Sequence, residues 1–349
     1  MADNFVMTEK SRRRVALWLY SGCFLIFVMV VIGGITRLTG SGLSITEWKP
    51  IMGSIPPLND EEWRIAFEKY QEIPQFKKIN AHFELEDFKS IYWWEYIHRL
   101  LGRIIGIVFI IPFLYFLFTK QMDRSTMRKT LFLFVLGGIQ GFLGWFMVSS
   151  GLTERTSVSH IRLAIHLIAA LITFGFTFWY ALELRYPAAQ DHSAKGSKGV
   201  VRLIFLVLML QILYGAFVAG LHAGKMYTTF PLMDGQIIPR GIAGMDPLMT
   251  NLINNPVTVQ FIHRFFAYAL LFLIASVWWT AKKKGMNEGQ RKAMNFVLLA
   301  VTLQFLLGVF TLLTKVETTL ASLHQVGALF LFATMVFLMF QFRTIRSNN

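Results

Sequence analysis

Four of the eight histidines lie inside long apolar stretches of the chain, where ionisable side chains are rare. They are His98, His166, His263 and His324, and each follows about one helical turn after the start of its stretch. A lone histidine in such a place can be an interhelical hydrogen-bonding group, but four at a matching depth favour metal ligation. Imidazole suits iron, copper and zinc, and two facing helices that each donate one histidine could ligate a haem iron on both sides. Zinc would need a third or fourth ligand, which the sequence does not place there.

Four arginines accompany these histidines within the same stretches: Arg99, Arg103, Arg162 and Arg264. A guanidinium group pairs bidentately with a carboxylate, so these side chains are candidates for binding the two propionates of a haem. For any single arginine, the alternative is that it extends to the membrane interface.

One carboxylate stands out because the matching position elsewhere in the chain is uncharged. Glu95 lies three residues before His98, and Gln260 lies three residues before His263. The spacing places Glu95 on the helix face of His98, which makes it the candidate catalytic group. The alternative is a salt bridge to Arg99 or Arg103.

The elements that must position these residues are membrane-spanning helices. The 349 residues are 54% hydrophobic and only 15% charged, with a mean hydropathy of +0.50. The apolar residues form eight stretches, each near the ~20 residues that cross a bilayer. Alternating barrel strands are excluded. The stretches are 16–35, 93–118, 130–149, 161–183, 200–220, 257–280, 294–313 and 320–341.

The net charge of +14 reflects membrane orientation rather than nucleic-acid binding. Lys and Arg concentrate at the N-terminus, in loops 119–130, 184–202 and 281–293, and in the C-terminal tail. By the positive-inside rule, both termini are expected on the cytoplasmic side, or on the matrix side in a mitochondrion. The single cysteine, Cys23, allows no internal disulfide and no Cys-based metal site.

An internal repeat divides the chain into two halves. Glu95–Arg99 reads EYIHR and Gln260–Arg264 reads QFIHR, and Gln140 and Gln304 occupy corresponding positions in later helices. Each half has four helices, so the halves should insert with the same orientation. We therefore predict an all-α membrane protein with eight transmembrane helices arranged as two pseudo-symmetric four-helix bundles. The predicted units are 1–190 and 191–349.

Two long outward loops, 36–92 and 221–256, separate helices within the halves. In the first, Asn59 provides an N-cap, and Trp63, Phe67 and Tyr70 recur at helical spacing. This pattern predicts an amphipathic helix on the outer surface. The second loop has no such periodicity, and it could cover a site or simply connect two helices.

These motifs together resemble the haem A synthase family, and within it the cysteine-free subgroup of alphaproteobacteria and mitochondria. The resemblance rests on Gly33–Ser44 (GGITRLTGSGLS), Glu95–Arg99, Phe261–Arg264 and the histidines at 166 and 324. It implies oxidation of the C8 methyl of haem O to a formyl group through successive hydroxylations, giving haem A for cytochrome oxidase. It also implies a bound haem b, with haem O as substrate, and with haem O synthase and cytochrome oxidase assembly factors as partners. If Glu95 does chemistry, unit 1–190 holds the substrate haem on His98 and His166, and unit 191–349 holds the permanent cofactor haem on His263 and His324. The short N-terminus, which lacks a transit-like segment, favours a bacterial inner membrane.

Two other functions fit parts of the pattern. A di-haem membrane electron-transfer cytochrome would need the same histidine pairs, although both pairs here share one leaflet. A haem O synthase would need Asp-rich motifs for Mg²⁺-diphosphate, and the predicted helices contain none. Analysis of the haems bound to the purified protein distinguishes the electron-transfer cytochrome from a haem A synthase.

Overall fold

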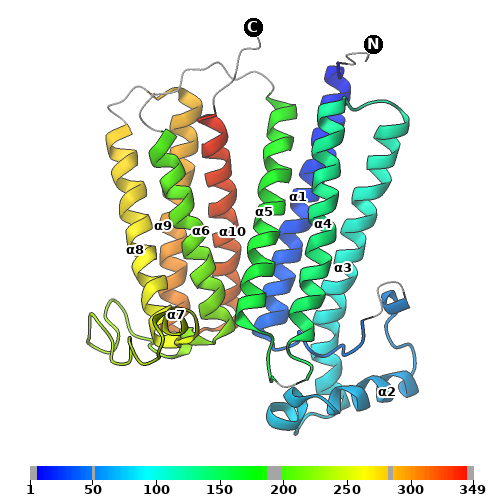
Figure 1. Cartoon of the computed structure of the whole chain (residues 1–349), viewed down its shortest axis with the longest axis vertical. Coiled ribbons are helices and arrows are strands. Elements are labelled where there is room, and N and C mark those ends of the chain that lie inside the picture. The colour runs from blue at the N-terminus through cyan, green and yellow to red at the C-terminus, as the bar shows by residue number, and fades with distance from the viewer. Residues whose placement is uncertain (1–5, 49–51, 154, 187–197, 282–285, 344–349) are drawn as a thin grey trace. The chain divides into compact units, whose positions relative to one another are not determined.

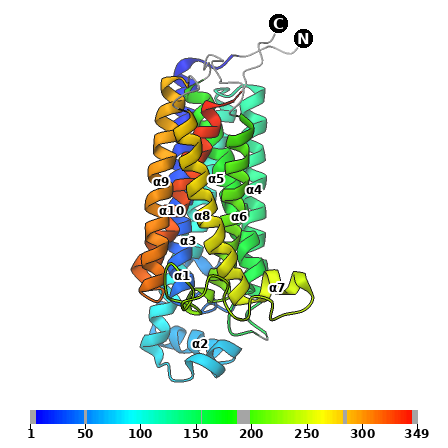
Figure 2. The same ribbon diagram turned by 90° about the vertical axis from the view of Figure 1, so that its left-hand side faces the viewer.

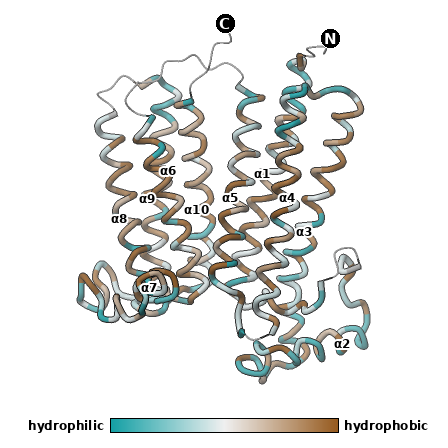
Figure 3. The backbone as a smooth tube through the Cα atoms, in the orientation of Figure 1, coloured by the Kyte–Doolittle hydropathy of each residue, from teal (hydrophilic) through white to brown (hydrophobic). Residues whose placement is uncertain are grey.

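The computed structural model describes residues 6–48, 52–153, 155–186, 198–281 and 286–343. Within these residues the regular structure is helical, and eight helices are long and apolar enough to cross a membrane, which confirms the predicted number. Figure 3 shows the apolar residues that run along them. The eight helices are α1 (Glu9–Leu38), α3 (Leu85–Phe118), α4 (Arg124–Ser149), α5 (His160–Arg185), α6 (Lys198–Gly220), α8 (Pro256–Ala281), α9 (Glu288–Leu313) and α10 (Thr318–Gln341).

The chain divides into two compact units. Unit 1 comprises residues 1–11 and 20–174, and unit 2 comprises residues 12–19 and 175–349. The predicted boundary at residues 190 and 191 lies outside the described residues, as do parts of the basic loops and tail (187–197, 282–285 and 344–349). The chain is therefore an all-helical, multi-pass membrane protein, and the pseudo-symmetry of its two bundles stays a prediction.

Helix α3 begins at Leu85, eight residues before the predicted start of its apolar stretch at residue 93. The extension packs against α2 (Asp60–Gln71), the predicted amphipathic helix, whose N-cap Asn59 accepts a hydrogen bond from the backbone of Glu62 at 2.9 Å. The Trp63 ring lies 4.9 Å from that of Tyr92, measured between centroids. The aromatic face of α2 is thus covered by the start of α3 (Figures 1 and 2).

In unit 1 the spanning helices contact one another in chain order. The Thr36 hydroxyl on α1 donates to the carbonyl of Trp94 on α3 at 3.3 Å. The rings of Phe109 on α3 and Phe134 on α4 stack with centroids 6.2 Å apart. Hydrogen bonds then join α4 to α5, as described below for Gln140. Consecutive membrane helices are therefore neighbours.

Unit 2 repeats this order with α6, α8, α9 and α10. Helix α6 packs on α8 and α10, and α9 packs on the same two helices. The core between them contains fully buried aliphatic side chains: Ile204, Leu208, Val297, Met335 and Leu338. The loop between α6 and α8, which includes the short helix α7 (Leu248–Asn254), lies at the end of the unit where α8 begins (Figure 1).

Candidate functional site

Each unit contains one pair of the membrane histidines. His98 on α3 and His166 on α5 belong to unit 1, and His263 on α8 and His324 on α10 belong to unit 2. The rings of His263 and His324 face each other with centroids 6.5 Å apart and with perpendicular planes. The structure thus brings the second pair together at the end of unit 2 where α8 and α10 begin.

The start of α10 is fixed by Glu317, seven residues before His324. Its carboxylate accepts hydrogen bonds from the backbone N–H groups of Thr319 and Leu320, each at 2.9 Å. These bonds favour the charged form, which holds the pKa of the Glu317 carboxyl below its usual range. They also satisfy two of the free N–H groups of the first turn, so the first turn of α10 is well defined.

A glutamine bridges the third and fourth helices of each unit at its histidine. The amide nitrogen of Gln140 donates to the carbonyl of His166 at 2.9 Å, and that of Gln304 donates to the carbonyl of His324 at the same distance. The two glutamines correspond in the sequence repeat. Both act as interhelical hydrogen-bond donors that fix the height of a histidine on the adjacent helix.

The two units differ in what their histidine Nδ1 atoms contact. Nδ1 of His263 lies 3.2 Å from the carbonyl oxygen of Gln211, and Nδ1 of His324 lies 3.1 Å from the amide nitrogen of Gln304. Nδ1 of His166 is buried and has no hydrogen-bond partner among the described residues. Because a bonded Nδ1 fixes the ring orientation, the pair in unit 2 is held more firmly than His166.

Glu95 is buried, and its carboxylate accepts four hydrogen bonds. One oxygen accepts from the Ser44 hydroxyl at 2.8 Å and from the backbone N–H of Ile45 at 2.9 Å. The other accepts from Nε and Nη2 of Arg99, at 3.0 and 2.7 Å. The salt bridge considered as an alternative role for Glu95 is therefore present within α3. The bonds from Ser44 and Ile45 join α3 to the segment that follows α1.

Arg99 completes this connection. Its Nη2 donates to the carbonyl of Ile45 at 2.8 Å and its Nη1 donates to that of Glu47 at 2.9 Å. The charge of Arg99 is thus paired with Glu95, and its donors bind protein groups. Arg103 lies one turn further along α3, where its Nη1 atom is buried.

The matching residues of unit 2 bind the segment that follows α6. The amide nitrogen of Gln260 donates to the carbonyl of Tyr227 at 2.8 Å. Arg264 donates from Nη2 to the same carbonyl at 2.7 Å and from Nη1 to that of Thr229 at 2.9 Å. Its Nε is buried and has no hydrogen-bond partner within the described part of the chain. Unlike the carboxylate beside Arg99, the partners of Arg264 in these bonds are neutral.

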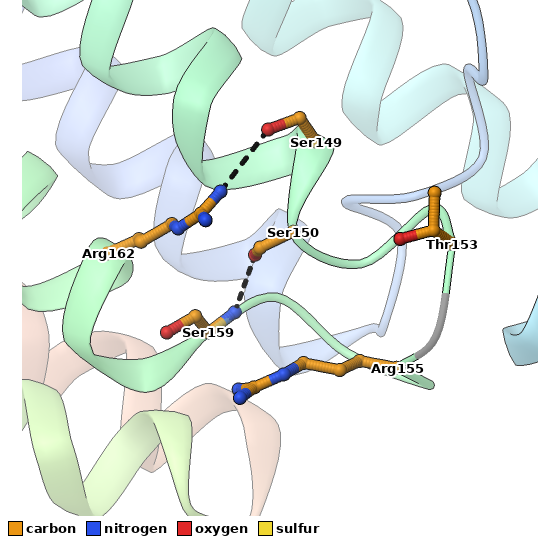
Figure 4. A pocket seen from close by; sticks show the side chains of 6 residues that line it. All are labelled: Ser149, Ser150, Thr153, Arg155, Ser159 and Arg162. Carbon is orange, nitrogen blue, oxygen red and sulfur yellow. Dashed lines mark hydrogen bonds between the residues drawn. The ribbon is translucent and has the colours of Figure 1, made fainter.

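Arg162 lies at the edge of a polar cavity of about 400 Å³ between the end of α4 and the start of α5. Its guanidinium stacks 3.8 Å from the ring of Phe146 and donates to the carbonyl of that residue at 2.7 Å. Figure 4 shows Arg162 and Arg155 with Ser150 and Ser159 between them. The cavity is lined by Ser149, Ser150, Thr153, Arg155, Ser159 and Arg162. Two cations with hydroxyl donors form a lining suited to an anion, such as a carboxylate.

Sequence reasoning missed several of these contacts. Nothing in the sequence marked Arg155, which lines the cavity beside Arg162, or Gln211, which contributes a backbone carbonyl. Ser44 belongs to the motif Gly33–Ser44, but its partner Glu95 lies 51 residues further along the chain. The internal repeat is the signal that could have found these contacts. In each half, the segment that follows the first membrane helix binds the second membrane helix.

Known proteins resemble this chain over nearly its whole length. Residues 16–336 match the COX15-CtaA family, described as cytochrome oxidase assembly protein. A protein named Heme A synthase from Flavobacterium johnsoniae is 46% identical over 94% of this chain and 98% of its own length. Proteins of the same name from Nitrosospira multiformis and Rhizobium meliloti are 43% and 46% identical, over 95% and 92% of this chain and 94% and 88% of their own lengths. The chain therefore belongs to the COX15-CtaA family of cytochrome oxidase assembly proteins.

Proposed function

We propose that this protein is a haem A synthase, an oxidoreductase that converts the C8 methyl of haem O to a formyl group through hydroxylated intermediates. The name shared by its relatives supports this function. The geometry that carries it is the facing histidine pair of unit 2, together with a corresponding pair in unit 1. On this proposal haem O is the substrate, and the product supplies cytochrome oxidase, with haem O synthase and assembly factors as partners.

Haem b is the cofactor proposed for His263 and His324, and the residues fit it. The two ring centroids lie 6.5 Å apart, a separation that would admit one metal ion between them, because a histidine nitrogen binds a metal at about 2 Å. The carbonyl of Gln211 accepts a proton held on Nδ1 of His263, which leaves Nε2 free to ligate. When bound, the haem supplies one-electron redox chemistry.

His324 needs the same tautomer to ligate through Nε2, and its proton then needs an acceptor at Nδ1. The buried oxygen of the Gln304 side chain has no hydrogen-bond partner among the described residues. A half-turn of that amide would present its oxygen to Nδ1, with loss of the bond that the amide nitrogen donates to the carbonyl of His324. The end of the Gln304 amide that faces Nδ1 thus sets the tautomer of His324.

The substrate site proposed in unit 1 uses His98 and His166 as haem O ligands. The unpartnered Nδ1 of His166 is consistent with a site that accepts and releases its ligand at each turnover. The cavity beside Arg162 and Arg155 offers donors for a substrate carboxylate. Arg99 and Arg103 remain proposed propionate-binding residues, with the charge of Arg99 shared with Glu95.

Glu95 is the proposed catalytic group of this site. A carboxylate has about four acceptor positions, and all four are used here. Of the donors, only the Ser44 hydroxyl can turn to accept a hydrogen bond, because the others are N–H groups. Oε2, which Ser44 contacts, is therefore the atom at which Glu95 would take up a proton during methyl oxidation.

The test of function is co-expression with a source of haem O, followed by extraction and chromatography of the haems. We expect haem A in cells that express the protein and haem B with haem O or haem A in the purified protein. Haem B in both sites, with no haem A formed, would instead establish a di-haem electron-transfer cytochrome.

The location proposed for the enzyme is the bacterial inner membrane, with both termini in the cytoplasm. The concentration of Lys and Arg at the termini and in three loops supports this orientation. The histidine pairs would then lie near the periplasmic face. This orientation can be tested with single cysteines introduced into loop 119–130 or loop 221–256. Labelling of intact cells shows which of the two loops lies on the outer side of the membrane.

Arg264 is expected to bind a propionate of the cofactor haem, because its buried Nε is a charged donor with no hydrogen-bond partner in the described residues. Replacing Arg264 by Leu should weaken haem retention by roughly tenfold or more, and Arg264→Lys should weaken it less, because Lys keeps the charge and loses only the fork. The measurement is haem per protein after dialysis against a haem-binding competitor.

Gln260→Leu is the matched control for that experiment, because it removes a contact with Tyr227 without removing a charge. Haem retention in Arg264→Leu equal to that of the wild type would show that Arg264 only anchors the segment at Tyr227 and Thr229. Equal losses in Arg264→Leu and Gln260→Leu would lead to the same conclusion.

A further inference from the structure

All four membrane histidines contact a glycine on the preceding spanning helix. The pairs are Gly33 on α1 with His98, Gly144 on α4 with His166, Gly215 on α6 with His263, and Gly308 on α9 with His324. We call these four residues the seat glycines. Each contact lies within one unit, and each joins the first helix to the second or the third helix to the fourth.

A side chain at any of these four positions would crowd the histidine ring. A Cβ atom added at Gly33, Gly144, Gly215 or Gly308 would lie 3.0, 3.2, 3.0 or 2.9 Å from the nearest atom of the histidine ring. Carbon atoms in favourable contact lie about 3.5–4.0 Å apart, so an alanine at these positions requires the ring to move. Backbone and ring therefore touch directly at each of the four places.

Other glycines of α4 and α6 show that a glycine in these helices need not lie against a side chain. Helix α4 also contains Gly137, Gly138 and Gly141, and a Cβ on any of these would meet nothing within 4 Å. The same holds for Gly199 at the start of α6. Among the four glycines of α4, only Gly144, opposite His166, lies against a side chain in this way.

We propose that the seat glycines are positioning residues that set the orientation of the four haem-ligating rings, an inference that rests on the proposed function. In unit 2 the ring edge at Cε1 of His263 and of His324 lies on its glycine, while Nδ1 is held by Gln211 or Gln304. Two contacts on different atoms of one planar ring fix both its position and its rotation. The perpendicular arrangement of the two ring planes follows from them.

The contact of Gly33 with His98 differs from the other three in one respect. The atom of His98 nearest to Gly33 is Nε2, whereas the nearest atom of the other three rings is Cε1. Nε2 of His98 therefore lies beside the α1 backbone at Gly33. A side chain at residue 33 would press on the nitrogen that is proposed to bind the substrate iron, so this position should control substrate binding.

The experiment uses the full-length purified protein with its haem and the series Gly308→Ala and Gly308→Val, with Gly215→Ala as a second site. Alanine is a better helix former than glycine, so helix stability alone would not lower haem binding. We expect haem affinity to fall by roughly 10- to 100-fold in the alanine variants, the range seen when groups that orient a metal-binding histidine are changed. Haem should be absent from Gly308→Val.

The haem that remains in Gly308→Ala should also report ring rotation. Its midpoint potential and its low-spin electron paramagnetic resonance spectrum should differ from those of the wild type, because both depend on the orientation of the axial imidazoles. The control Gly199→Ala, on the same helix as Gly215, should keep both signals unchanged. A change in folding alone would not shift the spectrum of correctly bound haem.

In unit 1, Gly33→Ala and Gly144→Ala should leave the haem signal of unit 2 intact and lower the affinity for added haem O. Gly138→Ala on α4 is their control. The inference would be overturned if Gly308→Ala and Gly308→Val kept the affinity, potential and spectrum of Gly199→Ala while His324→Leu lost the haem. If His324→Leu also kept the haem, the proposed ligand set itself would be wrong.

Discussion

Replacing Glu95 by Gln is expected to lower haem A formation by at least about 10²-fold, the usual effect of losing a group that transfers a proton or stabilises charge. The side chain keeps its size and can still accept hydrogen bonds from Ser44 and Ile45, but it loses the charge that pairs with Arg99. Haem O or a hydroxylated intermediate should accumulate. The haem on His263 and His324 should remain, because that pair belongs to the other unit.

The measurement is chromatographic quantitation of haems from cells that express the wild type and the variant at equal protein levels. Glu61→Gln, the same chemical change at an exposed position of α2, serves as the control and should form normal amounts of haem A. Near-normal haem A from Glu95→Gln would mean that the carboxylate only holds the segment after α1 against α3. The optical spectrum of the bound haem shows whether each variant is folded.

Replacing either His263 or His324 by Leu should abolish the low-spin haem b spectrum of the purified protein. Changing groups that merely orient such a histidine costs about 10- to 100-fold in metal affinity, so loss of the ligand itself should cost more. The loss should be equal for the two variants, since each removes one of two facing rings. Absorption spectroscopy of the oxidised and reduced protein measures it.

His82→Leu is the matched control, because His82 is exposed and lies before the start of α3. An unchanged low-spin spectrum in both His263→Leu and His324→Leu would exclude this pair as the ligands. His98→Leu and His166→Leu should keep the spectrum and lose haem A formation. That contrast tests the assignment of cofactor and substrate to the two units.

The sequence by itself determined the transmembrane helices and the candidate residues. A run of about 20 apolar residues can satisfy its backbone only as a helix in a bilayer, so composition and length were sufficient to find all eight. The N-cap at Asn59 was readable because capping depends on one side chain and its own helix. The repeat of EYIHR and QFIHR paired the residues now seen in matching contacts on α3 and α8.

The sequence misplaced the start of α3, because hydropathy marks only the part of a helix that crosses the membrane. Residues 85–92 are amphipathic, and they are helical in a protein environment where Phe88 and Tyr92 pack against the aromatic face of α2. That packing joins residues about 20 to 30 positions apart, which no local pattern records.

Only the tertiary structure decided how the candidate residues are held. It showed that Glu95 binds Ser44 and Ile45, that a backbone carbonyl of Gln211 faces His263, and that Arg155 joins Arg162 in one cavity. It also separated the seat glycines from their neighbours on the same helices. A backbone carbonyl has no residue type, and a glycine that touches a ring has the same letter as one that faces open space. These contacts exist only once helices distant in the chain are packed together.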